Sequence, residues 1–112
     1  MQKTLKVLIV EDSESDALLL VLALEQADYI VISERIETAQ ELHRALDTQI
    51  WDVVLADYSL PQFTAIDALK IVQEKQLDMP FIIVRTYALP TKNPVVGRFL
   101  GARSAPKNRP TA

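Results

Sequence analysis

The chain has 112 residues, of which 49% are apolar and 24% are charged, and this composition is typical of one globular domain. It contains no cysteine, which excludes disulfides, thiolate metal sites and cysteine nucleophiles. Its single histidine, His43, excludes a histidine-rich metal site within one chain. No apolar run approaches the roughly 18 residues of a membrane span. We therefore expect a cytoplasmic protein without a membrane partner.

Charge divides the chain into two parts. All 15 acidic residues lie in residues 1–84, which carry a net charge of −9, whereas residues 85–112 contain six basic residues and no acidic one. Both glycines and four of the six prolines also lie in the second part. Such a shift in composition marks a boundary. We therefore predict a folded core over residues 1–84 and an atypical basic tail over residues 85–112.

The predicted elements of the core alternate between strands and helices. Short apolar, β-branched runs predict strands over residues 5–10, 29–35, 51–57 and 79–84. Apolar residues at helical spacing predict helices over residues 16–27, 38–47 and 64–75. Ser13 or Ser15 is suited to cap the first helix, and Thr38 the second. Short links between alternating strands and helices predict a doubly wound parallel sheet of the α/β class.

Carboxylates follow two of the predicted strands. The first strand ends at Glu11 and Asp12, and the third ends at Asp57. In such a sheet, ligands bind beyond the carboxyl ends of the strands, where the strand order reverses. Crowded carboxylates repel one another, and a hard divalent cation such as Mg²⁺ relieves that repulsion. Taken alone, Glu11 is more typical of a turn residue, and the pair Glu11 and Asp12 is typical of solvated charge in a first helical turn. Acidic residues after two separate strands instead favour a metal or phosphate site.

The runs "VLIVEDSESDALLL", "WDVVLADYSLP" and "PFIIV" resemble the receiver domain of bacterial two-component response regulators. The resemblance covers residues 3–84 and implies a flavodoxin-like sheet of strand order 2-1-3-4-5. It also implies that Asp57 accepts a phosphoryl group from a histidine kinase or phosphotransfer protein. Asp12 would bind Mg²⁺ directly, Glu11 would bind it mostly through water, and the backbone carbonyl of Ser59 would complete the protein ligands.

The chain departs from the family pattern in two places. The family carries a Ser or Thr at the end of strand four, where this chain has Arg85; Thr86 follows one residue late and would point to the opposite face of a strand. The family also carries a lysine at the end of strand five. Lys107 lies at a suitable distance along the chain, but no apolar strand leads into it and prolines flank it.

The tail shows no pattern for the remaining elements of a receiver. We therefore expect its C-terminal strand and helices to be missing or rearranged, which leaves strand four as an apolar edge and uncovers part of helix one. Exposed apolar surface drives association, so we expect a homo-oligomer formed through the strand-four edge, helix one and the tail. Although six basic residues in the tail could contact phosphates, with Tyr87 and Phe99 to stack, the acidic core argues against a nucleic-acid partner.

Two functions remain open from the sequence. The first is a single-domain receiver that relays phosphate through Asp57 with Mg²⁺ and catalyses at most its own phosphorylation and dephosphorylation. The second is a degenerate receiver that works as an oligomerising interaction module without phosphorylation. Glu11, Asp12 and Asp57 favour the first, whereas Arg85, the missing lysine and the tail favour the second.

Overall fold

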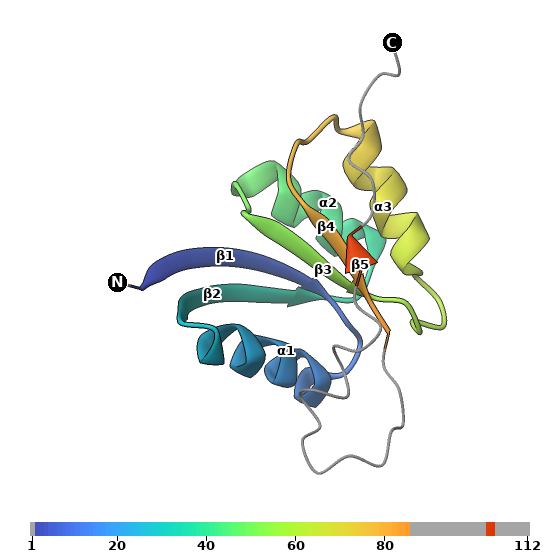
Figure 1. The fold of residues 1–112 in the computed structure, drawn as a ribbon. Coiled ribbons are helices and arrows are strands. Elements are labelled where there is room, and N and C mark those ends of the chain that lie inside the picture. Colours follow the sequence, from blue (N-terminus) through green and yellow to red (C-terminus); the bar gives the residue numbers. More distant parts are fainter. Residues whose placement is uncertain (1, 86–102, 105–112) are drawn as a thin grey trace.

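Four parallel strands form the centre of the sheet in a computed structural model, which describes residues 2–85 and 103–104 (Figure 1). They are β1 (Lys3–Val10), β2 (Tyr29–Ile36), β3 (Val53–Asp57) and β4 (Phe81–Val84). The order across the sheet is β2-β1-β3-β4, followed by a short strand β5 (Arg103–Ser104). The chain thus leaves β1 in one direction to form β2 and returns past it to form β3. This reversal places the carboxyl ends of β1 and β3 side by side.

Three helices connect the strands, and each begins at a residue whose side chain caps it. In α1 (Glu14–Gln26), the Ser13 hydroxyl accepts a hydrogen bond from the amide of Asp16 at 3.2 Å. In α2 (Ala39–Thr48), Thr38 plays the same part, and α3 (Ala65–Glu74) begins with a capping box of Thr64 and Asp67. Such a cap stabilises a helix by about 1 kcal/mol. The predicted cap of α2 is confirmed, and Ser13 rather than Ser15 caps α1.

The sheet has helices on both of its faces, with α1 on one face and α2 and α3 on the other (Figure 1). In β3, Val53 and Leu55 belong to the core beneath α1, whereas Val54 and Ala56 belong to the core beneath α2 and α3. Successive side chains of a strand point to opposite faces, so a strand covered on both sides needs apolar residues on both faces, as Val53 to Ala56 provide before Asp57. All five residues of β3 are buried. The predicted doubly wound α/β sheet is therefore confirmed.

The far edge of the sheet differs from the expectation of a bare fourth strand. β5 pairs antiparallel with β4, with Arg103 opposite Ile83 and Ser104 opposite Ile82. Two residues are too few to show a periodic pattern, so the sequence does not predict this strand. Because β5 is antiparallel, it runs away from the end of the sheet where β3 finishes. Its two described residues therefore do not form the parallel fifth strand that the resemblance implied.

Several predictions made for the tail fall outside the described residues. These concern Thr86, Tyr87, Phe99 and Lys107, together with the expectation that the receiver helices after β4 are missing or rearranged. Within residues 2–85 and 103–104, no helix combines the length and the apolar character needed to cross a membrane.

Candidate functional site

Asp57 is the last residue of β3 and lies almost fully buried, with 4% of its surface exposed. Val84, the last residue of β4, is its neighbour in register. Past these two residues, the Tyr58 amide donates to the carbonyl of Val84 at 2.8 Å and holds the two strand ends together. The Ser59 amide donates to Oδ1 of Asp57 at 2.9 Å. The carboxylate of Asp57 is therefore fixed at the carboxyl end of the sheet, as the sequence predicted.

Glu11 directly follows β1 and is 1% exposed. Its amide donates to the carbonyl of Ile36 at 3.1 Å, and its own carbonyl accepts a hydrogen bond from Arg35 at 3.2 Å. Its side-chain Oε2 accepts the Ser13 amide at 3.2 Å. Since β1 and β3 are neighbours in the sheet, these bonds hold Glu11 beside Asp57.

A third carboxylate, which the sequence analysis did not identify, joins these two. One side-chain oxygen each of Glu11, Asp16 and Asp57 lies within 4.8 Å of the others. Asp16 comes from the first turn of α1, where the Cα–Cβ bonds tilt toward the start of the helix and hence toward the strand ends. Its place three residues after the cap Ser13 is the signal that could have indicated it. We call Glu11, Asp16 and Asp57 the acid cluster.

The environment of Glu11 raises its pKa from 4.5 to about 9. Burial is the largest cause, because it disfavours the charged form. A hydrogen bond to Asp57, the negative charge of Asp57 and a hydrogen bond to Asp12 raise the pKa further, whereas the Ser13 amide lowers it. In the absence of a cation, this environment therefore favours the protonated form of Glu11 near neutral pH.

The remaining residues predicted at the site lie around the acid cluster. Asp12 is exposed, contacts Glu11 through its side chain, and lines a cleft of about 330 Å³ with Thr38 and Leu60. It is not a member of the acid cluster found among the described residues. Ser59 lies in the exposed turn after β3 and binds Asp57 through its amide.

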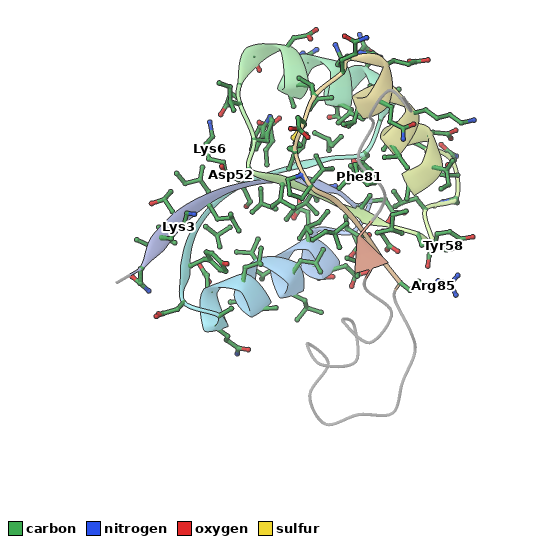
Figure 2. All side chains as sticks on the ribbon, turned by 45° about the horizontal axis from the view of Figure 1, so that its top comes forward. Lys3, Lys6, Asp52, Tyr58, Phe81 and Arg85 are labelled. Atoms are coloured by element: carbon green, nitrogen blue, oxygen red, sulfur yellow. The ribbon has the colours of Figure 1, made fainter. Side chains whose placement is uncertain are left out.

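Two arginines stand at the carboxyl end of the sheet. Arg35, near the end of β2, forms ion pairs with Glu14 at the start of α1 (3.5 Å) and with Glu37 just before the cap of α2 (3.4 Å). Arg85 directly follows β4, and its guanidinium carbon lies 4.7 Å from the centre of the Tyr58 ring (Figure 2). Arg85 occupies the position at which the resemblance leads one to expect a hydroxyl side chain.

The donor set of the acid cluster fits a hard divalent cation. Mg²⁺ prefers oxygen ligands and is held in proteins by one or two carboxylates together with water or phosphate. Three carboxylates, two of them buried, supply such oxygens within 4.8 Å of one another. Burial and the neighbouring carboxylate of Asp57 both raise the pKa of Glu11, so full negative charge on the cluster is disfavoured without a cation.

Comparisons with solved structures support the fold. CheY4 of Vibrio cholerae, a chemotaxis response regulator, is 26% identical with a TM-score of 0.59, and the match covers 82% of this chain and 77% of CheY4. Full-length FixJ from B. japonicum is 23% identical with a TM-score of 0.58, over 70% of this chain and 38% of FixJ. A fusion carrying a yeast Spc42 trimeric coiled coil is 23% identical with a TM-score of 0.63, over 80% of this chain and 57% of the fusion. This chain thus spans about half or less of the last two.

A comparison with curated proteins finds no match. The family model of the response regulator receiver domain matches residues 7–97, which is more than half of the chain. That match begins within β1, includes β2, β3 and β4, and contains all three residues of the acid cluster. The chain therefore belongs to the family of response regulator receiver domains.

Proposed function

We propose that this chain is a phosphoacceptor in two-component signalling, and that Asp57 takes a phosphoryl group from a histidine of a kinase or phosphotransfer protein. The observation that carries the proposal is the burial of Asp57 at the carboxyl end of β3, within 4.8 Å of the carboxylates of Glu11 and Asp16. Burying a single carboxylate without a partner would lower the stability of the fold. A carboxylate grouped with two others at a sheet switch point is suited to phosphate chemistry.

The reaction requires an ionised oxygen of Asp57. That oxygen attacks the phosphorus atom, the bond from phosphorus to the histidine nitrogen breaks, and the electron pair stays on that nitrogen. The product is an acyl phosphate on Asp57. The Ser59 amide, which donates to Oδ1, orients the carboxylate for this attack. The chain thus catalyses at most its own phosphorylation and dephosphorylation.

Mg²⁺ is the cofactor that we propose for this site. Asp57, Glu11 and Asp16 are the residues whose geometry would hold it, and the resemblance adds Asp12 and the Ser59 carbonyl. When bound, the ion would neutralise charge on the oxygens of the phosphoryl group during transfer. Ligand oxygens must be free of protons, so binding requires Glu11 to give up the proton that its environment favours.

The test is the intact mass of the chain after incubation with acetyl phosphate and Mg²⁺. We expect one phosphoryl adduct on the wild type and none on Asp57→Asn. The matched control is Asp28→Asn, because Asp28 is exposed and adopts a left-handed conformation (φ 75°) that asparagine also tolerates. A chelator in place of Mg²⁺ should abolish the adduct. A folded wild type without adduct, or an adduct that survives Asp57→Asn, would reject the proposal.

The second candidate is an interaction module that needs no phosphorylation. Arg85 in place of the family hydroxyl favours it, and so do the exposed apolar side chains of α1, Leu18 and Leu22. Under either function we propose that the chain associates with copies of itself. The absence of an adduct on the folded wild type would select the second candidate.

A further inference from the structure

Arg85 and Tyr58 form a pair at the carboxyl ends of β4 and β3 (Figure 2). Each follows the last residue of its strand, and those last residues, Val84 and Asp57, are neighbours in register. The hydrogen bond from the Tyr58 amide to the Val84 carbonyl fixes this arrangement at 2.8 Å. Neighbouring strands lie about 4.8 Å apart. The backbone of Arg85 is therefore held one strand spacing from the segment that carries Asp57.

Charge at this end of the sheet is unbalanced. The acid cluster brings three carboxylates together. Among the described residues, the ion pairs involve Arg35 and Lys75, and Arg35 already serves Glu14 and Glu37. Arg85 instead lies on the face of an aromatic ring that is 49% exposed. It is thus a full positive charge at the end of the strand next to the one that carries Asp57, held on the ring by a contact that is weak at an exposed site.

In the unphosphorylated protein, the carboxylate of Asp57 offers Arg85 few accessible oxygen atoms. It is 4% exposed, and its Oδ1 already accepts the Ser59 amide. A phosphoryl group on Asp57 would change this, because it adds three oxygens that extend beyond the end of the strand. β4 ends at Val84, so no further strand residue separates the Arg85 side chain from that space. A planar guanidinium can bind two phosphoryl oxygens at once, which is a stronger interaction than stacking on an exposed ring.

We propose that Arg85 is a phosphoryl-binding residue that exchanges the Tyr58 ring for the phosphoryl group when Asp57 is phosphorylated. The inference rests on the proposed function of Asp57 and deepens it. Arg85 then supplies the positive charge that the family places on its fifth strand, and its departure uncovers the Tyr58 ring. The exchange thereby couples phosphorylation to a change in the exposed surface beside β3 and β4.

The experiment measures how fast acetyl phosphate with Mg²⁺ phosphorylates the wild type, Arg85→Gln, Arg85→Lys and Tyr58→Leu. Arg44→Gln is the matched control, because Arg44 is exposed on α2, away from the strand ends. We expect Arg85→Gln to react about tenfold more slowly, as the loss of one charge-assisted contact implies. Arg85→Lys should fall in between, and Arg44→Gln should match the wild type. Tyr58→Leu removes the competing ring and should react at least as fast as the wild type.

A second readout follows the guanidinium itself. In the nuclear magnetic resonance spectrum of the wild type, the side-chain N–H signal of Arg85, assigned by its loss in Arg85→Lys, should shift on phosphorylation. An unchanged signal, a wild-type rate for Arg85→Gln, or a slowing in Tyr58→Leu equal to that in Arg85→Gln would each overturn the exchange while Asp57 remains a phosphoacceptor. A wild type that takes no phosphoryl group would reject the function of Asp57, and the inference with it.

Discussion

Among the described residues for which a pKa shift is resolved, Glu11 is the one whose charged form its environment disfavours most. Its side chain is buried, and its pKa lies at about 9 because burial and Asp57 both oppose its charge. The unfolded chain releases the same proton near pH 4.5. Between these two values only the folded state holds the proton. The stabilisation linked to that proton is therefore complete below pH 4.5 and is lost as the pH rises toward 9.

This linkage predicts how stability changes with pH when a chelator keeps the protein free of metal. The free energy of unfolding should fall between pH 5 and pH 8, with a contribution from Glu11 of up to about 1.4 kcal/mol per pH unit. Glu11→Gln keeps a hydrogen-bonding side chain without a titrating proton, and should flatten the profile. Urea titrations at a series of pH values measure the effect. Glu25→Gln, an exposed change on α1, should leave the slope as it is; equal slopes for the wild type and Glu11→Gln would contradict the assignment.

The sequence predicted single residues of the site only where they lie at the end of a predicted strand. Asp57 and Glu11 follow apolar runs, and a parallel sheet brings the ends of neighbouring strands together. Asp16 is different, because its approach to Asp57 depends on how α1 packs on the sheet and not on spacing along the chain. Asp12, predicted as a direct Mg²⁺ ligand, is exposed and contacts Glu11, because it lies where the chain leaves the strand for the Ser13 cap. Its role as a ligand stays a prediction.

At the scale of the elements, the end of α3 contains a strained position. Gln76 adopts a left-handed conformation with φ of 57°, directly after the capping residue Lys75. A side chain with a Cβ is disfavoured there, whereas glycine is not. Gln76→Gly should therefore raise the free energy of unfolding by about 0.5–1 kcal/mol, after allowance for the greater freedom of glycine in the unfolded chain.

The matched control for that change lies in the same helix. Lys70 is exposed in the middle of α3, where glycine has no conformational advantage, so Lys70→Gly should lower stability by about 1 kcal/mol. Denaturant titrations of both variants give the two signs in one assay. If Gln76→Gly were as destabilising as Lys70→Gly, the left-handed conformation would not be present in solution.

The elements themselves were largely predictable, and their boundaries less so. Thr38 caps α2 as expected, because a threonine before an amphipathic run provides the oxygen that the first amides need. α1 begins two residues earlier than predicted, since its acidic first turn lacks the apolar spacing that identifies the rest. β4 begins at Phe81 rather than Met79, because Pro80 has no amide hydrogen to donate and contributes only its carbonyl, to Val54.

At the scale of the whole molecule, alternation of strands and helices was enough to predict the sheet but not its far edge. Each helix returns the chain to the amino end of the sheet, which forces the four long strands to run parallel. β5 obeys no such rule, because its two residues pair with Ile82 and Ile83 from a segment without apolar periodicity. This pairing covers part of the edge through which association was expected. Of the surfaces proposed for association, α1 is therefore the one that a variant can test most directly.

The surface of α1 predicts association of the chain with itself. Ala17 and Leu20 are the buried residues of the helix, whereas Leu18 and Leu22 are 56% and 40% exposed. These two leucines lie four residues apart and so share one side of the helix, and Leu18 also lines an open groove of about 730 Å³ against β2. Burial of an apolar side chain of this size is worth about 1.5–3 kcal/mol. We expect the average mass in sedimentation experiments to rise with protein concentration above that of the monomer.

A variant with Leu18→Glu and Leu22→Glu should sediment as a monomer over the same concentrations, because two charges would then be desolvated in the contact. Ile50→Glu is the control: Ile50 is 86% exposed but lies after α2 and outside the α1 surface, so it should not alter the mass. A wild type that stays monomeric at every concentration would remove the case for association. Dissociation by Ile50→Glu alone would place the contact at the opposite end of the sheet, beside Trp51 and Met79.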